Sequence, residues 1–337
     1  MERDPARLMS DPAQPILSVK DLQMHFPVKG GVFLTAQAVC RAVDGVSLDI
    51  MPGETLGLVG ESGCGKSTLG KCIVRLLKPT SGSVHYEGAD LATLSNRQLK
   101  PLRRQIQMIF QDPADSLNSR HTVRGILEEP FIIQKIGSAE SRRKRIDELL
   151  SLVGLPTTAA DRFPFEFSGG QRQRIGIARA IALNPKLIIC DEPVSALDVS
   201  IQSQILNLML ELQASFKLSY LFIAHDLAVV KHISDRIAVM YLGRIVELAG
   251  AEAIHRSPRH PYTRALISAI PVPDPNQKRK RIVLSGDVPS PINPPAGCPF
   301  HTRCPHVKEV CCQEVPKLRE VTSDDGIPHQ VSCHFDL

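Results

Sequence analysis

The sequence predicts an α/β fold around a parallel sheet, followed by a small irregular extension at the C-terminus. Apolar segments at 55–60 (TLGLVG) and 186–190 (KLIIC) are typical of buried parallel strands. After the first of them, 67–78 (STLGKCIVRLLK) has apolar residues at helical spacing. The 337 residues, 43% of them apolar, suffice for one large domain and a smaller one.

The composition excludes several classes of protein. No apolar run approaches the roughly 20 residues of a membrane-spanning helix, and the N-terminal MERDPARLMSDPAQ lacks the apolar segment of a secretory signal. We therefore expect a cytosolic chain with reduced thiols. The net charge is only +5, and the basic runs at 141–145 and 277–281 have no interleaved aromatic residues. We interpret them as solvated surface charge, with anionic lipid headgroups as the weaker alternative, and expect no nucleic-acid partner.

The first elements in the chain are β-rich and lead to a phosphate-binding loop. Segments 16–26 and 39–50 favour strands, and residues 60–67 then fit the pattern G-x-x-x-x-G-K-[ST] between a strand and a helix. The glycines let successive backbone N–H groups face phosphate oxygens at a helix N-terminus. Lys66 is placed to reach the β- and γ-phosphates, and the Ser67 hydroxyl is placed to bind Mg²⁺.

Two acidic residues end the strand at 186–190. Ligands of open α/β sheets lie at the carboxyl ends of strands, where Asp191 and Glu192 follow this segment. Asp191 is placed to orient Mg²⁺, and Glu192 is placed to activate the attacking water as a general base.

A second helix N-terminus suited to an anion lies in FSGGQRQRIGIARAIAL, which begins at Phe167. Ser168 has the character of an N-cap, while Gly169 and Gly170 leave backbone N–H groups accessible. Either both phosphate-binding ends close on one nucleotide within a chain, or each chain lends its second end to the nucleotide of a partner.

The order GESGCGKST, IFQDP, FSGGQ, IICDEP, SALD and IAHD resembles the ATP-binding subunit of an ABC transporter over residues 16–250. The resemblance implies a P-loop NTPase with a RecA-like core, an antiparallel β lobe, and a helical lobe over about 112–165. It also implies that two subunits meet head to tail with two ATP molecules between them.

The same resemblance implies roles for individual residues. Gln111 would link Mg²⁺ to the membrane subunits, Asp198 would lie in the loop that bridges the dimer, and His225 would hold the γ-phosphate and the attacking water. Phe26 is the candidate for stacking on adenine. The catalytic candidates are thus Glu192, His225, Lys66 and Gln111; the Mg²⁺ ligands are Ser67, Gln111 and Asp191; and the ATP-contacting residues are Phe26, Gly60, Glu61, Ser62, Gly63, Cys64, Gly65, Lys66, Ser67, Thr68, Ser168, Gly169, Gly170, Gln171 and Asp198.

Residues 251–337 differ in composition from the rest of the chain, with seven prolines between 271 and 295. PRHPYTRAL and SGDVPSPINPPAGCPFHTRC are similar to the C-terminal extension of the ATPases of dipeptide and oligopeptide importers, which also include some nickel systems. The resemblance implies an ATPase that powers peptide import across the bacterial cytoplasmic membrane and lies peripherally on its inner face. Its partners would be a paralogous ATPase forming a heterodimer, two membrane permease subunits, and an extracytoplasmic solute-binding protein.

The extension holds five of the nine cysteines. Their C-x5-C-x6-C spacing matches neither a ferredoxin run nor a zinc knuckle, so spacing alone leaves the site open. The resemblance implies a [4Fe-4S] cluster on Cys298, Cys304, Cys311 and Cys333, with Cys312 as the doubtful neighbour. The alternatives are zinc, assisted by His301, His306 or His334, and reduced structural thiols. We expect this site to shape the extension and to take no part in ATP chemistry.

Three other functions are disfavoured by the sequence. A soluble, non-transport ABC ATPase usually carries two cassettes, a chromosome-maintenance ATPase needs a long coiled coil, and a degenerate regulator would not retain Lys66, Glu192 and His225 together. The same ATPase role in a nickel or other small-solute importer remains the principal alternative.

Overall fold

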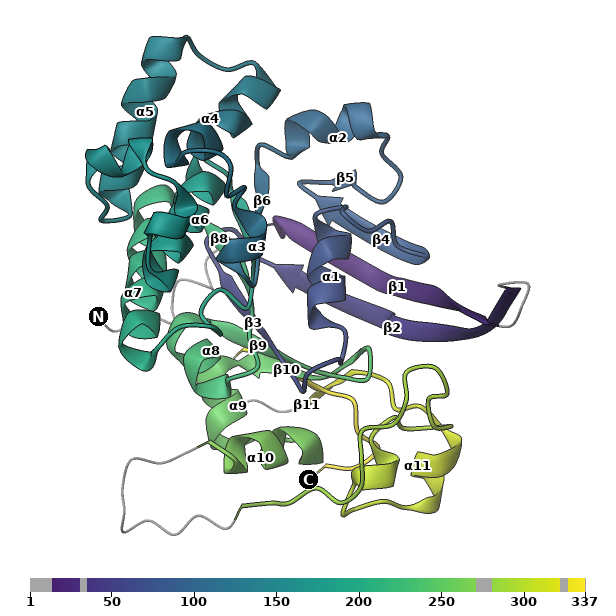
Figure 1. Ribbon diagram of the computed structural model, residues 1–337. Helices are drawn as coiled ribbons and strands as arrows, with labels where there is room; N and C mark the ends of the chain where they lie inside the picture. The colour runs from purple at the N-terminus through teal and green to yellow at the C-terminus, as the bar shows by residue number, and fades with distance from the viewer. Residues whose placement is uncertain (1–13, 31–34, 271–280, 322–326, 337) are drawn as a thin grey trace, which may run out of the picture.

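The computed structural model of the chain describes residues 14–30, 35–270, 281–321 and 327–336. The sequence predicts a flexible N-terminus over residues 1–15, and this segment lies almost wholly outside these ranges, as do residues 271–280 of the proline-rich stretch. The structure confirms the α/β fold, with an eight-stranded sheet, a four-stranded sheet and helices around them (Figure 1). Within the described residues, no helix combines the length and the apolar character that crossing a bilayer requires.

Parallel strands form the centre of the eight-stranded sheet. Its order is β6-β7-β8-β3-β9-β10-β12-β11, and neighbours from β6 to β9 run parallel. β3, β7 and β8 are buried along their whole length, which is consistent with their mostly apolar sequences. The bounds are β3 Thr55–Val59, β6 Ile106–Ile109, β7 Leu187–Asp191, β8 Ser219–Ile223, β9 Arg236–Tyr241 and β10 Arg244–Gly250.

The second sheet is antiparallel and packs with helix α1 (Lys66–Ile73). Its order is β2-β1-β4-β5, with bounds β1 Leu17–Gly30, β2 Thr35–Ile50, β4 Ser81–Tyr86 and β5 Ala89–Asp90. Leu22 and Val46 of this sheet share a hydrophobic cluster with Leu69 of α1. The short helix α2 (Asn96–Leu102) follows β5 and leads to β6.

Helices α4 (Val123–Gln134) and α5 (Ala139–Leu152) dominate the lobe at the top of Figure 1. Each begins at a hydroxyl that accepts a backbone N–H: Thr122 from Gly125 at 3.3 Å, and Ser138 from Ser141 at 3.2 Å. The lobe also contains the 3-10 helices η2 Thr157–Asp161 and η3 Pro164–Glu166. Below it lie α6 (Gly169–Ile181) and α7 (Val199–Phe216), while α8 (Leu227–Ile233) packs on β3. The short helix α3 (Pro113–Ser116) lies against α6, nearer the core sheet.

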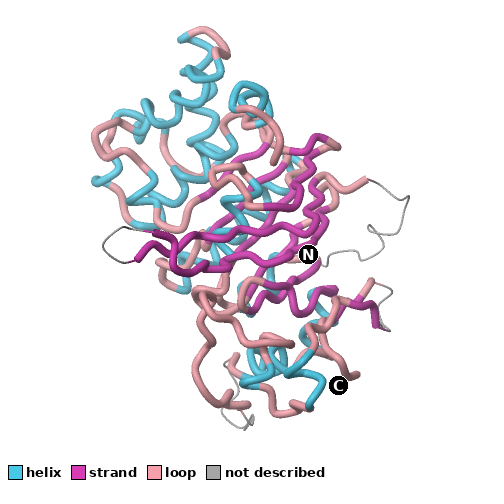
Figure 2. The backbone as a smooth tube through the Cα atoms, turned by 90° about the vertical axis from the view of Figure 1, so that its right-hand side faces the viewer, coloured by secondary structure: helices cyan, strands magenta, loops and turns pink. Residues whose placement is uncertain are grey.

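The C-terminal extension is more regular than the sequence predicts. After α9 (Ala251–Arg256) and α10 (Pro261–Ser268) it forms η4 (His301–Arg303), α11 (Glu309–Gln313), β11 (Arg319–Val321) and β12 (His329–Val331). β12 pairs antiparallel with β10, so the extension adds two strands to the core sheet. This pairing satisfies backbone groups that the edge of β10 would otherwise expose. Figure 2 shows that the remainder, at the lower end of the molecule, is mostly loop and short helix.

A buried carboxylate connects the extension to the core. Glu247 of β10 is fully buried and accepts hydrogen bonds from the backbone N–H groups of Arg259 (2.6 Å) and His260 (3.0 Å). Its Oε1 also lies 2.7 Å from Nε2 of His329 on β12, which is only 2% exposed. A buried charge requires such partners, so Glu247 holds segments from three parts of the chain together.

We predict that His329→Ala strongly destabilises the protein. Removing the hydrogen-bond partner of a buried carboxylate typically costs about 1–3 kcal/mol. The substitution should lower the melting temperature by several degrees and speed proteolysis after residue 281. As the matched control, Asp336→Asn removes the exposed ion pair between Arg319 and Asp336 (2.6 Å) and should change the melting temperature little. Equal melting temperatures for His329→Ala and the wild type would contradict the prediction.

Candidate active site

Four neighbouring strands end at one edge of the core sheet. In the order β6, β7, β8, β3, they are followed respectively by Gln111, Glu192, His225 and the loop 60–65. Since parallel strands present their carboxyl ends at the same edge, residues far apart in sequence converge there.

The loop 60–65 is built for close backbone approach. A Cβ atom on Gly60 would lie 2.1 Å from the Met240 carbonyl oxygen, and one on Gly65 would lie 2.0 Å from that of Ala42. Gly65 also has φ +109°, in the region that favours glycine. Only glycine therefore fits these two positions, which hold the loop between β2 and β9.

The ammonium group of Lys66 is held over this loop. Lys66 is 5% exposed, and its Nζ donates to the carbonyl oxygens of Gly60 (2.8 Å) and Glu61 (3.0 Å). Ser62, Gly63 and Cys64 complete the turn, and Thr68 follows in the first turn of α1. The arrangement places a cation at the N-terminus of a helix, where it can bind phosphate oxygens.

Ser67 and Asp191 meet although 124 residues separate them. The Ser67 Oγ donates to Asp191 Oδ1 at 2.6 Å. Burial raises the pKa of Asp191, while the hydrogen bond from Ser67 lowers it. A hydroxyl and a carboxylate oxygen are ligands suited to Mg²⁺, so the two predicted ligands lie side by side.

Glu192 lies between an amide and an imidazole. Its Oε2 accepts a hydrogen bond from Gln111 Nε2 at 3.0 Å and lies 3.4 Å from His225 Nδ1. The backbone at Glu192 is left-handed (φ 46°), and its N–H donates to the Ile223 carbonyl oxygen at 2.9 Å. This unusual backbone conformation directs the chain away from β7 directly after Asp191.

The second predicted anion site is formed locally but is separate from the phosphate loop of its own chain. The Ser168 hydroxyl accepts the Gln171 N–H (3.3 Å), and Gln171 Oε1 accepts the Ser168 N–H (3.1 Å), which begins α6 as a capping box. Asp198 is exposed at the N-terminus of α7. In the part of the chain that the structure describes, no hydrogen bond or ion pair joins Ser168, Gly169, Gly170 or Asp198 to residues 60–68.

Phe26 lies in β1, half-buried and opposite Cys40 of β2. Its role in adenine stacking stays a prediction.

The cysteines of the core are packing residues: Cys64, Cys72 and Cys190 are buried, and burial raises the pKa of each thiol.

Two contacts to the phosphate loop were missed by sequence reasoning. The Glu61 N–H donates to the Tyr262 hydroxyl at 2.8 Å, and the Arg303 guanidinium binds both carboxylate oxygens of Glu61, at 2.8 and 3.2 Å. Because Arg303 is 242 residues from Glu61, no local pattern could have indicated the contact.

The four cysteines predicted as cluster ligands line one small cavity. Cys298, Cys304, Cys311 and Cys333 surround it together with histidines 260, 301, 306 and 334. However, the described residues contain no group of three or more His, Cys, Asp or Glu side chains placed to hold a metal ion, so the predicted ligand cage is not shown. Burial raises the pKa of Cys298 to about 11, which favours the protonated thiol. Cys312 is exposed and does not line the cavity.

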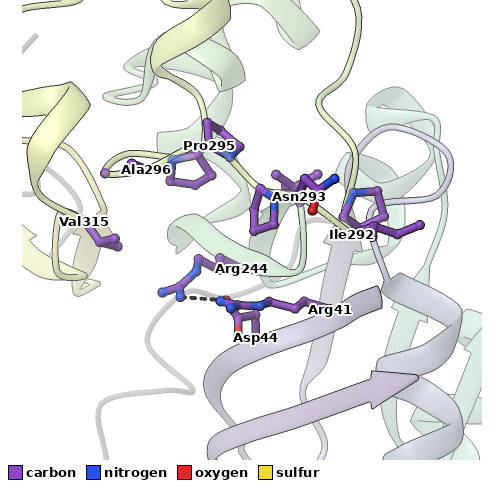
Figure 3. A pocket seen from close by; sticks show the side chains of 13 residues that line it. Arg41, Asp44, Arg244, Ile292, Asn293, Pro295, Ala296 and Val315 are labelled. Atoms are coloured by element: carbon purple, nitrogen blue, oxygen red, sulfur yellow. Dashed lines mark hydrogen bonds and ion pairs between the residues drawn. The ribbon is translucent and has the colours of Figure 1, made fainter. Parts of the chain in front are cut away.

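A larger pocket of about 480 Å³ lies between the extension and the antiparallel sheet (Figure 3). Arg41, Asp44 and Arg244 face the proline-containing segment 291–299 across it, and Arg244 pairs with Asp44 at 2.7 Å. None of its lining residues is among the predicted site residues.

Comparison with known proteins agrees with this geometry. Residues 43–195 match the family described as ABC transporter, and residues 246–311 match the one described as Oligopeptide/dipeptide transporter, C-terminal region. The chain is 53% identical to the oligopeptide transport ATP-binding protein AppF of Bacillus subtilis, over 95% of this chain and 97% of that protein. It is also 53% identical to the probable peptide ABC transporter ATP-binding protein y4tS of Sinorhizobium fredii, over 95% and 89% of the two chains.

Among solved structures, the ATP-binding cassette MJ0796 in a dimeric post-hydrolysis state with ADP and Pi is similar, with a TM-score of 0.63 and 32% identity. The structural match covers 70% of this chain and 98% of the cassette. A second similar structure is cbiO1 from Clostridium perfringens (TM-score 0.61, 27% identity), over 72% and 91% of the two chains. The phosphate loop, the acidic strand end and these similarities together show that the chain belongs to the ATP-binding proteins of ABC transporters, in the branch with the oligopeptide/dipeptide transporter C-terminal region.

Proposed function

We propose that this chain is the ATP-hydrolysing subunit of an importer that carries peptides across the bacterial cytoplasmic membrane. The observation that carries the proposal is the position of Glu192, directly after the Asp191–Ser67 pair and within reach of Gln111 and His225. The match to the oligopeptide/dipeptide C-terminal region and the names of the similar proteins support peptides as the solute.

The geometry supports a direct attack of water on the γ-phosphate of ATP. The phosphates are bound by the loop 60–65 and Lys66. Mg²⁺ would be held by Ser67, Asp191 and Gln111, and when bound it neutralises negative charge on the phosphates. Glu192 takes a proton from the attacking water. The water oxygen forms a bond to the γ-phosphorus, and the bond between the γ-phosphorus and the oxygen that leaves with ADP breaks. His225 holds the γ-phosphate and the water. Since chemistry of this kind depends on positioning, the convergence of four strand ends is its structural basis.

The separate location of Ser168 and Gly170 favours a shared site. In a head-to-tail dimer these groups would contact the nucleotide bound by the partner, with Asp198 beside the interface. We propose a paralogous ATPase as that partner, with two membrane permease subunits, an extracytoplasmic solute-binding protein, and a peripheral position on the inner face of the membrane. A nickel or other small-solute importer remains the alternative, and identifying the solute bound to the copurified complex distinguishes them.

The four cysteines that line one cavity support a [4Fe-4S] site on Cys298, Cys304, Cys311 and Cys333. Thiolates are the ligands that such a cluster requires. The extension contains short loops rich in proline, so a metal centre would add folding free energy that apolar burial alone does not supply there. The neighbouring histidines make zinc the alternative metal.

We predict that Glu192→Gln abolishes turnover while retaining ATP binding. Loss of a general base should lower kcat by about 10²- to 10⁴-fold, because the phosphate loop and the Mg²⁺ ligands stay intact. Lys66→Ala should instead weaken ATP binding itself. ATPase kinetics and nucleotide binding of the purified transporter measure both effects, with Glu252→Gln as the control, since Glu252 is 61% exposed and pairs with Lys231. Normal turnover by Glu192→Gln would refute its role.

We predict that the isolated chain hydrolyses ATP poorly and requires a different ATPase subunit. Ser168 and Gly170 supply the phosphate contacts of a neighbouring chain, so a monomer lacks a complete site. Size-exclusion chromatography with light scattering and an ATPase assay test this. Full activity from a stable homodimer would exclude the heterodimer but retain the dimer, whereas full activity from a monomer would exclude both.

We predict about four iron atoms with matching sulfide per chain after anaerobic purification. Cys298→Ser should remove the iron and the visible absorption, whereas Cys312→Ser should retain both, because Cys312 is exposed and lies outside the cavity. Stoichiometric zinc without sulfide would establish the alternative metal.

A further inference from the structure

The C-terminal extension reaches the phosphate loop through one arginine. Arg303 ends η4 and directly precedes Cys304, and its side chain is only 8% exposed. Its guanidinium binds both oxygens of the Glu61 carboxylate, at 2.8 and 3.2 Å. Paired hydrogen bonds of this kind fix the orientation of both side chains.

A cluster of aromatic rings includes Phe300, three residues before Arg303, and Tyr262, which also contacts Glu61. Phe300, Tyr241 and Tyr262 are almost fully buried, with centroids 4.8 to 5.5 Å apart. Tyr262 also accepts the Glu61 N–H at 2.8 Å. Residues from α10 and η4 therefore hold both the backbone and the side chain of Glu61.

Glu61 also contacts the phosphate-binding lysine. Its carbonyl oxygen accepts a hydrogen bond from Lys66 Nζ at 3.0 Å, so the residue that Arg303 orients in turn orients the ammonium group. An unpaired carboxylate in this loop would repel the phosphates of a nucleotide. Arg303 places a positive charge against that carboxylate.

The extension is attached on a second side of the loop. The Arg41 N–H of β2 donates to the Pro291 carbonyl oxygen at 3.0 Å, and the neighbouring Ala42 carbonyl lies against Gly65. The prediction that the cysteine site takes no part in ATP chemistry concerns other residues of the extension, and these contacts were not predicted from the sequence.

We propose that Arg303 is a positioning residue for nucleotide binding, and that it acts by orienting and neutralising Glu61 of the phosphate loop. The C-terminal extension thereby forms part of the nucleotide site. This inference rests on the proposed function, because it requires that the phosphate loop binds ATP.

The test is a double-substitution cycle read out as the Kd for ATP with Mg²⁺ on the purified full-length chain. Arg303→Gln should weaken binding by about tenfold, because the Glu61 carboxylate is left unpaired beside the phosphates. Arg303→Lys should restore much of the loss, since it retains the charge. Glu61→Gln combined with Arg303→Gln should bind ATP more tightly than Arg303→Gln alone, which a purely structural role would not produce.

The matched control is Arg256→Gln, which removes an exposed arginine that pairs with Glu252 at 3.9 Å and should leave the Kd unchanged. If Arg303→Gln alone does not fold, the substitution is measured in a Glu61→Gln background: a Kd that differs by more than about twofold between Glu61→Gln and the double variant would overturn the proposal, because Arg303 would then act without the Glu61 carboxylate. A wild-type affinity in folded Arg303→Gln, or no recovery in the double variant, would also overturn it. Failure of the wild type to bind ATP would instead contradict the proposed function.

Discussion

The parallel pairing of β6, β7, β8 and β3 is the constraint on which the rest of the site depends. The pairs Ile109↔Cys190, Cys190↔Phe222 and Leu58↔Ile223 place the four strand ends at nearly the same level. Groups separated by more than 100 residues of chain thereby come within hydrogen-bonding distance, as the Ser67–Asp191 contact shows. A shift of one strand by a single residue would reverse the faces of its side chains and separate these groups.

Polar groups buried at this edge are paired with one another. The Lys66 ammonium donates hydrogen bonds to backbone carbonyls, and the Asp191 carboxylate accepts one from a hydroxyl. The Glu192 carboxylate accepts a hydrogen bond from an amide and lies beside an imidazole. Burying a charge without such partners would cost several kcal/mol. The partners of Asp191 and Glu192 follow other strands of the sheet, so these contacts form only when the sheet has formed.

The C-terminal extension belongs to the same cooperative structure. β12 extends the core sheet, Glu247 is buried against His329, and Phe300 lies in the hydrophobic cluster that also contains Tyr241. The aromatic contacts around Phe300 connect the cysteine-lined cavity to the phosphate loop, since Cys298 and Cys304 flank the segment that carries both Phe300 and Arg303. The lining of the cavity and the arginine that contacts Glu61 therefore lie on one short segment of the chain.

The sequence by itself determined the α/β class, the phosphate loop and the Ser168 cap, because each depends on residues close together in the chain. The apolar run 187–190 and the glycines at 60 and 65 carry their structural requirement locally. The contacts Arg303–Glu61 and His329–Glu247 and the addition of β12 to the sheet were decided only by the tertiary structure. The Arg303–Glu61 contact joins residues 242 positions apart, and the His329–Glu247 contact joins residues 82 positions apart. A pairing over such a distance is set by the packing of the whole core rather than by any spacing within one segment.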